Sequence, residues 1–535
     1  MPTKLLLGDE AVAQGAIDAG LSGAYAYPGT PSTEITEYVE KSPQAREGLI
    51  RSFWSANEKT AVEAALGMSY AGKRAMASMK HVGLNVAADP FINAAITGTS
   101  GGLIVNAADD PSMHSSQNEQ DSRLYTEIAL VPCLEPSNQQ EAYDMVSYAF
   151  DLSERFRVPV LLRLVTRLAH SRAPVTLRTH REQNQTRLPD DPERFIILPP
   201  TARRQYAALV ARQEDFVRES ERSPFNHLAD GPDASLGIVA SGIGVNYVLE
   251  AFAGEVPHPF LKIGQYPLPA LLVDRLFHRC ERILVVEEGY PYIEAKLRGL
   301  PERRSPQILG RMSGELPRTG ELTPALVARA LGRRAEAGIP PSSVPVPRPP
   351  SLCPGCPHAD TFRALTEALG TFPETARVFS DIGCYTLGAY PPFSAIHTCV
   401  EMGASITMAK GAADAGIGPV VSVIGDSTFA HSGMTGLLDA VLDRSPITVV
   451  ILDNLAVAMT GGQRSCATGR LEAICTGLGV EPAHVREIVP VPKEHEKNVA
   501  VLREEIRYAG PSVVIARREC LQTARRAERL AREGA

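Results

Sequence analysis

The sequence lacks the features that mark membrane-spanning and secreted proteins. No window approaches about 18 uncharged apolar residues, so we expect no transmembrane helix. The first 20 residues contain no apolar core long enough for a signal peptide, which predicts a cytoplasmic protein. Aromatic residues make up 6% of the chain, with one tryptophan among 535 residues, so they indicate no particular substrate pocket.

The chain also lacks a strong charge of either sign. Its formal net charge of -7 keeps it soluble and gives no electrostatic case for binding nucleic acid. Basic residues gather between Arg517 and Arg532, but acidic residues such as Glu519 and Glu528 are interleaved with them. This pattern predicts a solvated C-terminal helix rather than a nucleic-acid-binding tail.

The length of the chain exceeds what one hydrophobic core can serve, so several domains are expected. A hydrophobic content of 44% and a charged content of 21% are typical of globular proteins. Strand-like and helix-like segments alternate repeatedly, which predicts α/β domains. The predicted segments are an α/β domain (1–187), a linker or elaboration with at most one helix (188–233), a smaller α/β domain (234–337), a proline-rich linker (338–352) and a last α/β domain (353–535).

The most informative stretch is 420–463. Two apolar, β-branched runs, Val420–Ile424 and Ile447–Leu452, flank a helix-like segment, Gly433–Leu442. Runs of this kind are typical of strands buried on both faces of a parallel sheet. The first run ends on Gly425-Asp426-Ser427 and the second on Asp453-Asn454. Ligands of open α/β sheets bind at the carboxyl ends of the strands, so a ligand site is expected here.

Asp426 and Asn454 offer oxygen donors, which Mg²⁺ prefers, and phosphate oxygens would complete such a site. Gly425 allows a close approach of the backbone. The spacing is similar to the thiamine diphosphate signature, Gly-Asp-Gly followed by Asn-Asn, although Ser427 and Asp453 depart from it. The structural alternative is a crossover whose strands end in ordinary turn residues.

Polar residues also follow the strand-like segments of the first domain. Thr30 lies in a turn after Gly23–Tyr27, Glu58 follows Leu49–Phe53, and His81 follows Ala75–Met79. We therefore expect them at one edge of a sheet. Each has a structural alternative: Thr30 as a turn residue, His81 as a satisfied polar residue, and Glu58 as part of a capping box that begins at Ser55.

Nine cysteines, an odd number unevenly spread, do not indicate a disulfide framework in a cytoplasmic protein. Cys353-Pro354-Gly355-Cys356 turns tightly enough for both thiols to face one metal or cluster. A thioredoxin-like pair is the alternative, but it would be expected within a βαβ pattern. Two further ligands could come from strand ends at Cys384 and Cys520, with Cys399, Cys466 and Cys475 as competitors, while Cys133 and Cys280 are expected to be buried or incidental thiols.

Five motifs together resemble one family over nearly the whole chain. They are Asn57-Glu58-Lys59 and the stretches 79–90 (MKHVGLNVAADP), 109–121 (DDPSMHSSQNEQD), 353–358 (CPGCPH) and 425–434 (GDSTFAHSGM). They are similar to the large subunit of indolepyruvate ferredoxin oxidoreductase, a 2-oxoacid:ferredoxin oxidoreductase. The resemblance implies a multi-domain α/β thiamine diphosphate-binding fold, with two doubly wound parallel-sheet domains (pyrimidine and diphosphate type) and a smaller transketolase-C-terminal-like α/β domain.

The resemblance also implies roles for individual residues. Glu58 would hydrogen-bond the aminopyrimidine ring of the cofactor, and Thr30 would lie near the substrate. His81, His431 and Gln117 are expected to position substrate or move protons. The implied cofactor residues are Glu58, Asn85, Gly425, Asp426, Ser427, Asn454 and Ala456, with Mg²⁺ on Asp426, Asn454 and the Ala456 carbonyl, and one [4Fe–4S] cluster on Cys353, Cys356, Cys384 and Cys520.

The implied reaction is the oxidative decarboxylation of a 2-oxoacid, an aryl pyruvate such as indolepyruvate, to an acyl-CoA. The chain ends 15 residues after Cys520, without the ferredoxin-like domain of the family's large subunit. We therefore expect one cluster at most, and an electron acceptor that is ferredoxin, a small second subunit or another carrier. The active site is expected between the first and last domains, in a dimer or hetero-oligomer.

Two other interpretations stay open at this point. One is a non-oxidative thiamine diphosphate-dependent decarboxylase or carboligase, which would need no cluster. The other is a cofactor-binding subunit without turnover of its own. Iron and sulfide content would separate the first of these from the oxidoreductase.

Overall fold

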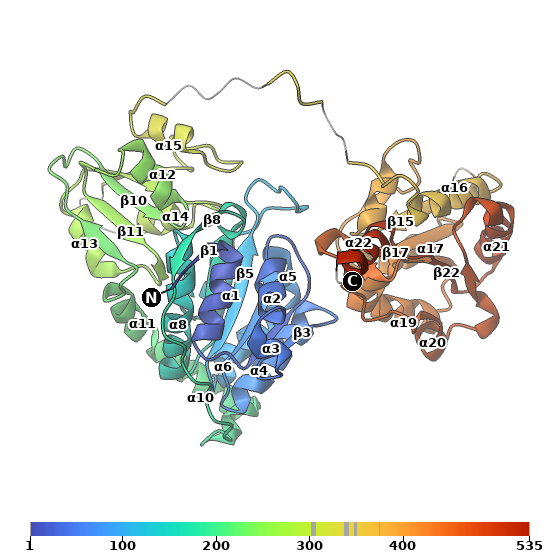
Figure 1. Cartoon of the computed structure of the whole chain (residues 1–535), viewed down its shortest axis with the longest axis horizontal. Coiled ribbons are helices and arrows are strands. Elements are labelled where there is room, and N and C mark those ends of the chain that lie inside the picture. The colour runs from blue at the N-terminus through green and yellow to red at the C-terminus, as the bar shows by residue number, and fades with distance from the viewer. Residues whose placement is uncertain (1, 301–305, 336–341, 347–349, 374, 534–535) are drawn as a thin grey trace. The chain divides into compact units, whose positions relative to one another are not determined.

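The computed structural model describes residues 2–300, 306–335, 342–346, 350–373 and 375–533. The chain divides into two compact units, Met1–Pro340 and Pro341–Ala535 (Figure 1). The proline-rich linker predicted over 338–352 lies partly outside the described residues, which omit 338–341 and 347–349. The finer domain boundaries predicted from the sequence stay predictions.

The first unit is built on a seven-stranded sheet that is parallel except for one edge strand. Its strands, in spatial order, are β12 (Gln265–Tyr266), β6 (Cys133–Leu134), β7 (Val160–Val165), β5 (Leu103–Asp109), β4 (Ala75–Lys80), β2 (Gly23–Ala26) and β3 (Arg51–Trp54). A separate antiparallel pair joins β1 (Thr3–Leu7) to β8 (Arg172–Thr176).

Alternation along the strands explains how helices cover both faces of this sheet. Met76 of β4 and Ile104 of β5 pack in the same core as α1 (Gly8–Asp18), α2 (Thr33–Glu40) and α8 (Gln139–Phe156). Ala75 and Leu103, one residue earlier on each strand, pack with α4 (Glu58–Tyr70) and α6 (Ala88–Thr97). Shorter helices complete this part: α3 (Pro43–Arg46), α5 (His81–Val86), α7 (Arg123–Ala129) and α9 (Thr166–Ala169).

A second, five-stranded sheet lies in the same unit and shares a core with the first. Its order is β14 (Gln307–Leu309), β13 (Arg282–Val286), β10 (Gly237–Ser241), β11 (Phe260–Ile263) and β9 (His227–Ala229), the last antiparallel. The helices around it are α12 (Gly244–Ala251), α13 (Ala270–Phe277), α14 (Tyr292–Arg298) and α15 (Pro324–Ala330). Because β12 follows β11 and pairs with β6, the two sheets are tied together.

The segment 188–233 contains more structure than the sequence predicts. Besides a 3₁₀ turn, Pro192–Phe195, it forms two helices, α10 (Pro199–Ala211) and α11 (Gln213–Glu221), where at most one is expected. In α10 one residue is buried, Leu209. In α11 two residues are buried, Phe216 and Ser220. With so few apolar anchors the helical period is weak, which explains why the sequence pattern misses one helix.

A buried network of ion pairs lies at the carboxyl ends of the central strands of the first unit. Arg163 of β7 donates to Asp109 at 2.6 Å, and Arg123 of α7 pairs with Glu287 at 2.9 Å. Both arginine side chains are fully buried. Removing one partner from such a network leaves an uncompensated buried charge, which costs about 3–5 kcal/mol. The network therefore holds this edge of the sheet in a fixed arrangement.

The second unit contains a six-stranded, all-parallel sheet. Its order is β16 (Thr398–Cys399), β15 (Arg377–Ser380), β17 (Val420–Gly425), β18 (Ile447–Asp453), β22 (Ser512–Arg517) and β21 (Val485–Ile488). Its core clusters place α16 (Pro357–Leu369) and α21 (His495–Arg507) on one face, and α17 (Ala404–Asp414), α19 (Met434–Leu442) and α20 (Leu471–Gly477) on the other. The C-terminal helix α22 covers Leu521–Glu533.

The predicted α/β class and its doubly wound parallel sheets are confirmed. Both apolar runs of the stretch 420–463 form neighbouring parallel strands, β17 and β18, with every residue buried. Their carboxyl ends, which carry Asp426 and Asn454, therefore meet at one edge. In the part of the chain that the structure describes, no helix is long and apolar enough to cross a membrane.

Candidate active site

In the first unit, three residues predicted for the site each follow one of three neighbouring strands. Thr30 comes after β2, Glu58 after β3 and His81 directly after β4, and the sheet order is β4-β2-β3. Glu58 is 5% exposed and His81 is 1% exposed. The fold thus brings these residues to one edge of one sheet, as the sequence pattern predicts.

The capping interpretation of Glu58 is wrong. The residue that caps α4 is Asn57, whose side chain accepts a hydrogen bond of 2.9 Å from the Thr60 backbone N–H. Thr60 in turn donates from its hydroxyl to the Asn57 carbonyl at 3.0 Å. Asn is among the best N-cap residues, so the box is complete without Ser55. Glu58 is thus the first residue of α4 and not the start of a capping box at Ser55.

Two neighbours of Glu58 come from the end of β4 and from α5, which follows it. A Cβ on Gly83 would lie 2.6 Å from Oε1 of Glu58 and 2.7 Å from its Cγ, so the carboxylate packs directly over this glycine. Lys80 lies within electrostatic reach of Glu58. Burial lowers the pKa of Lys80, while Asp110 and Glu58 oppose that decrease. The sequence motif contains both residues, but its pattern assigns neither of them a contact.

The loop after β5 connects Thr30, Lys80 and His81. The Ser115 hydroxyl donates to the Thr30 carbonyl at 3.3 Å, and Lys80 donates to the Ser115 carbonyl at 2.9 Å. His81 Nε2 lies 3.1 Å from the Asn118 carbonyl, and its Nδ1 is buried with no hydrogen-bond partner among the described residues. In the same region Gln117 and Asn85 are exposed, and the Asn85 side chain accepts a hydrogen bond from Tyr125.

Asp110 holds this loop in place. Its carboxylate accepts hydrogen bonds from the hydroxyls of Ser116 and Thr166, both at 2.7 Å, and from the Ser115 backbone N–H at 2.8 Å. Burial raises the pKa of Asp110, but these hydrogen bonds outweigh it and the pKa lies below its ordinary value. Asp110 is therefore a charged anchor beside Lys80.

In the second unit, the carboxylate of Asp426 follows β17 and is 2% exposed. Its Oδ2 and the Ser427 hydroxyl are buried with no hydrogen-bond partner among the described residues. Burial and the neighbouring Asp453 raise the pKa of Asp426 to about 7. Buried acceptors of this kind are costly unless a cation or donor satisfies them, so the residues present fit a Mg²⁺ ion.

The turn after β18 presents Asn454 and the Ala456 carbonyl. Leu455 between them has a φ of 64°, a backbone conformation that branched and bulky residues rarely adopt. The Asn454 side-chain oxygen accepts a hydrogen bond of 3.2 Å from the Ala456 N–H. Strained backbone of this kind gathers at functional sites. Leu455 lies between two of the Mg²⁺ ligands predicted from the sequence, Asn454 and Ala456.

Gly425 is required for packing at this edge. A Cβ on Gly425 would lie 2.6 Å from the ring of Tyr385, and one on Gly383 would lie 2.2 Å from the same ring. The Tyr385 hydroxyl donates to Asp381, which also accepts from the Ser405 hydroxyl at 2.6 Å. Burial raises the pKa of Asp381 to about 6. The glycine therefore makes room for a buried aromatic ring rather than for a ligand alone.

The four cysteines predicted as cluster ligands lie near one another. Burial raises the pKa of Cys384 to about 12, and the thiols of Cys356, Cys520 and Cys353 add to that rise. The Cys356 backbone N–H donates to the Cys353 carbonyl at 2.9 Å, which closes the expected tight turn. By contrast, burial alone raises the pKa of Cys475 to about 12. The other three predicted thiols are thus neighbours of Cys384.

The remaining thiols have other surroundings. The Cys399 sulfur lies 3.8 Å from both the Asp381 carbonyl and the Thr386 hydroxyl. Cys466 is exposed, and Cys133 and Cys280 are buried in the first unit. The assignment of the cluster ligands stays a prediction.

Two contacts join the segments of the predicted cluster cysteines to the sheet edge that carries Asp426 and Asn454. The Cys520 backbone N–H donates to the Asn454 carbonyl at 3.1 Å. His358, two residues after Cys356, places Nε2 3.4 Å from the Asn454 side-chain nitrogen. Burial lowers the pKa of His358 to about 4, so the ring is neutral and can accept a hydrogen bond from Asn454. The sequence motif 353–358 contains His358, but its pattern does not reveal this contact.

His431 lies in a π-helical turn, Phe429–Gly433, between Asp426 and α19. It is 5% exposed, and its Nδ1 lies 2.5 Å from the Ser432 hydroxyl. Burial raises the pKa of Glu401, and the charge of His431 opposes that rise, so these two side chains are neighbours. Isolated π-turns are frequent at functional sites.

Comparison with known proteins agrees with this division of the site. Residues 14–222 match the family model described as pyruvate flavodoxin/ferredoxin oxidoreductase, thiamine diphosphate-binding, and residues 381–516 match the C-terminal domain of thiamine pyrophosphate enzymes. Indolepyruvate oxidoreductase subunit IorA of Archaeoglobus fulgidus is 40% identical, over 99% of this chain and 88% of that protein. The chain belongs to the IorA family. The IorA subunit of Methanothermobacter marburgensis is 39% identical over 96% of this chain and 86% of its own.

As an IorA-family member, the chain is a thiamine diphosphate-dependent 2-oxoacid oxidoreductase, as predicted. Thr30, Glu58 and His81 fall in the first matched region, and Asp426 and Asn454 fall in the second. A solved 2-oxoglutarate:ferredoxin oxidoreductase from Magnetococcus marinus shares the fold, with a TM-score of 0.50 and 17% identity over 62% of this chain and 65% of that one. Cys353, Cys356 and Cys520 lie outside both matched regions.

Replacing Gly83 with Ala is expected to displace the Glu58 carboxylate. The new Cβ would lie 2.6 Å from Oε1 and 2.7 Å from Cγ of Glu58, too close for the side chain to keep its position. Turnover should fall by about tenfold or more, because misplacement of a catalytic group by 1 Å can cost about 100-fold. Steady-state kinetics with saturating thiamine diphosphate measures the effect.

Gly67→Ala is the matched control for this prediction. Gly67 lies within α4, with nothing within 4 Å of a new Cβ. That change should leave turnover unaltered and stabilise the helix by about 0.5–1 kcal/mol. Equal turnover in the two variants would contradict the contact between Gly83 and Glu58.

Proposed function

We propose that the chain oxidises a 2-oxoacid, an aryl pyruvate such as indolepyruvate, to an acyl-CoA. The balanced reaction is R–CO–COO⁻ + CoA–SH → R–CO–S–CoA + CO₂ + H⁺ + 2 e⁻. The observation that supports this proposal most is that, within the second unit, the predicted Mg²⁺-binding edge lies next to the predicted cluster cysteines. His358 and Cys520 join the Asp426–Asn454 edge to a group of four thiols. A non-oxidative enzyme would not need that group.

Asp426, Asn454 and the Ala456 carbonyl are the proposed ligands of Mg²⁺. The buried Oδ2 of Asp426 and the hydroxyl of Ser427 need partners, and a cation with a diphosphate supplies them. When bound, thiamine diphosphate would supply a nucleophilic carbon for the keto carbon of a 2-oxoacid and an electron sink for the loss of CO₂, and a [4Fe–4S] cluster would accept electrons singly. The protein binds and orients these groups.

Glu58 is the proposed partner of the pyrimidine ring. Glu58 is buried and is the first residue of α4, whose N-cap is Asn57. In this position it would hydrogen-bond a nitrogen of the pyrimidine ring and so would control the protonation of the ring. The carboxylate packs against Gly83, and the positive charge of Lys80 lies within electrostatic reach of its negative charge.

Thr30, Lys80 and His81 are proposed to handle the substrate. Lys80 offers a positive charge that suits the carboxylate of a 2-oxoacid. If His81 Nε2 donates to the Asn118 carbonyl, Nδ1 carries the lone pair and can take a proton at that position. His431 and Gln117 keep the supporting roles that the resemblance implies.

Cys353, Cys356, Cys384 and Cys520 are proposed to hold one [4Fe–4S] cluster. Thiolates at four positions are the usual ligands of such a cluster. The electrons would leave to ferredoxin or a small partner subunit in the cytoplasm, where free thiols stay reduced. The relatives are themselves named as subunits, which supports a multi-subunit enzyme.

Iron and acid-labile sulfide in anaerobically purified protein test the redox part of this proposal. We expect about four of each per chain. Absence of both from protein that still binds thiamine diphosphate would contradict the one-electron route and favour non-oxidative decarboxylation. A screen of 2-oxoacids with a dye acceptor, with and without coenzyme A, would then identify the substrate, with aryl pyruvates expected to react fastest.

A further inference from the structure

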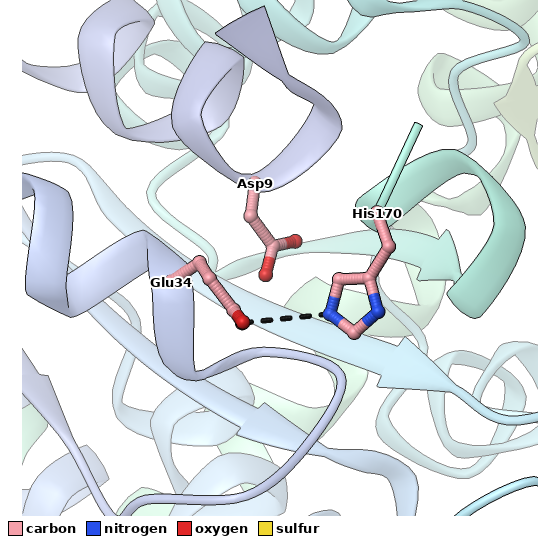
Figure 2. Close-up of side chains that lie close together, drawn as sticks. All are labelled: Asp9, Glu34 and His170. Carbon is pink, nitrogen blue, oxygen red and sulfur yellow. Dashed lines mark ion pairs between the residues drawn. The ribbon is translucent and has the colours of Figure 1, made fainter. Parts of the chain in front are cut away.

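Three side chains from distant segments converge within the first unit, and none of them is among the residues assigned above. Asp9 stands in the first turn of α1, Glu34 in the first turn of α2, and His170 directly after α9 (Figure 2). One ligand atom from each lies within 4.8 Å of the other two. His170 Nε2 and Glu34 Oε2 are 3.5 Å apart.

Asp9 is the unusual member of this cluster. It is 0% exposed, and neither carboxylate oxygen has a hydrogen-bond partner among the described residues. Figure 2 shows the carboxylate directed between Glu34 and His170. Burial raises the pKa of Asp9 well above its ordinary value, and the charges of Glu34 and Glu10 raise it further. The Asp9 carboxylate therefore has no stabilising partner among the described residues.

Helix capping does not account for Asp9. The residue that serves the N-terminus of α1 is Glu10, whose side chain accepts a hydrogen bond of 2.8 Å from the Leu7 backbone N–H. Glu34 and His170 form an ion pair in which each shifts the pKa of the other toward the charged form, but the buried Oε2 of Glu34 has no hydrogen-bond partner among the described residues. Asp9 thus places a buried carboxyl group without a hydrogen-bond partner beside this pair.

The backbone holds the three residues close together. A Cβ on Gly8 would lie 2.3 Å from the Leu168 carbonyl, so the start of α1 packs against α9 more closely than any other residue type permits. Apolar residues of α1 and α2 share one core. The cluster is therefore largely preformed, which lowers the entropic cost of binding a ligand.

We infer that Asp9, Glu34 and His170 form a binding site for a divalent transition-metal ion, separate from the proposed Mg²⁺ site. Two carboxylates and one imidazole are ligands that suit Mn²⁺, Fe²⁺ and Zn²⁺. The side chains of His170 and Glu34 are 34% and 37% exposed, so water can complete the coordination. The ion satisfies the buried Asp9 carboxylate and links α1, α2 and α9.

Such an ion would act on the substrate side of the first unit. The helix α2 starts three residues after Thr30, so fixing Glu34 fixes the end of the turn that carries Thr30. Thr166 at the start of α9 also donates to Asp110, the anchor of the neighbouring loop. An ion at this site would therefore restrain the start of α2 and the end of α9, two segments that lie next to residues of the candidate active site.

Titration of the full chain with Mn²⁺, followed by the electron paramagnetic resonance signal of the free ion, tests this site. Mn²⁺ is the probe because thiols compete for it poorly. Asp9→Asn, which keeps the shape of the side chain, and His170→Gln should each bind one Mn²⁺ fewer than the wild type. Glu10→Gln, one residue from Asp9, should bind as many as the wild type.

A second measurement reports the ligand itself. Nitrogen modulation of the Mn²⁺ spin echo should reveal a bound imidazole in the wild type and lose that component in His170→Gln. Mn²⁺ should also raise the unfolding temperature of the wild type more than that of Asp9→Asn. Equal Mn²⁺ stoichiometry in all four proteins would overturn the inference, whatever binds at Asp426. Because His170 is partly exposed, its variant keeps the test valid if Asp9→Asn folds poorly.

Discussion

Replacing Glu58 with Gln is expected to lower turnover by about 10²–10⁴-fold, the usual contribution of a positioned acid–base group. Glutamine has nearly the same shape, so packing against Gly83 is kept while the charge is lost. The amide can no longer control the protonation of the pyrimidine ring as the carboxylate does. Turnover with saturating 2-oxoacid, coenzyme A and thiamine diphosphate measures the effect.

Glu63→Gln is the control for that experiment. Glu63 stands on the same helix, with 45% of its side chain exposed and paired with Lys59. Exposed pairs of this kind contribute about 0–1 kcal/mol, so neither turnover nor stability should change much. If Glu58→Gln turned over as fast as Glu63→Gln, the role proposed for Glu58 would be wrong, and a cofactor-binding subunit without catalysis would gain support.

Replacing Cys384 with Ser is expected to remove most of the iron and sulfide, about four of each per chain. Cys384 is half-buried and lies near three other thiols, so a hydroxyl there offers a poor ligand in the middle of the group. Dye reduction that depends on coenzyme A should then be lost. Binding of Mg²⁺ and thiamine diphosphate should persist, because Asp426 and Asn454 are unchanged.

Cys399→Ser separates a cluster ligand from an ordinary thiol. Cys399 is also half-buried, and its sulfur lies near the Asp381 carbonyl and the Thr386 hydroxyl, not among the four thiols. A hydroxyl can take these contacts, so iron content and turnover should match the wild type. Iron retained in Cys384→Ser but lost in Cys399→Ser would show that the fourth ligand has been assigned wrongly.

The strands that carry the site could be predicted from the sequence because their burial is visible locally. A parallel strand covered on both faces gives an unbroken apolar run, as in β17 and β18, and the polar residue that follows must lie at the ligand-binding edge. The same argument places Thr30, Glu58 and His81 on one edge. The residues at strand ends were therefore within reach of pattern analysis.

Contacts between distant segments were not within its reach. The cap of α4 depends on whether the helix begins after Ser55 or after Asn57, and both spacings are plausible in the sequence. Strands β6 and β12 are two residues long, which is too short for a periodic signal. The contact of His358 with Asn454 spans 96 residues, and the convergence of Asp9 with His170 spans 161 residues (170 − 9). These features arise from tertiary packing alone.

The products formed from an aryl pyruvate by the anaerobic protein test the central claim most directly. With coenzyme A and a viologen present, the account predicts an acyl-CoA thioester, with two viologen molecules reduced for each CO₂ released. Release of CO₂ together with the free aldehyde, with no viologen reduced, would contradict the oxidative reaction and identify a non-oxidative decarboxylase.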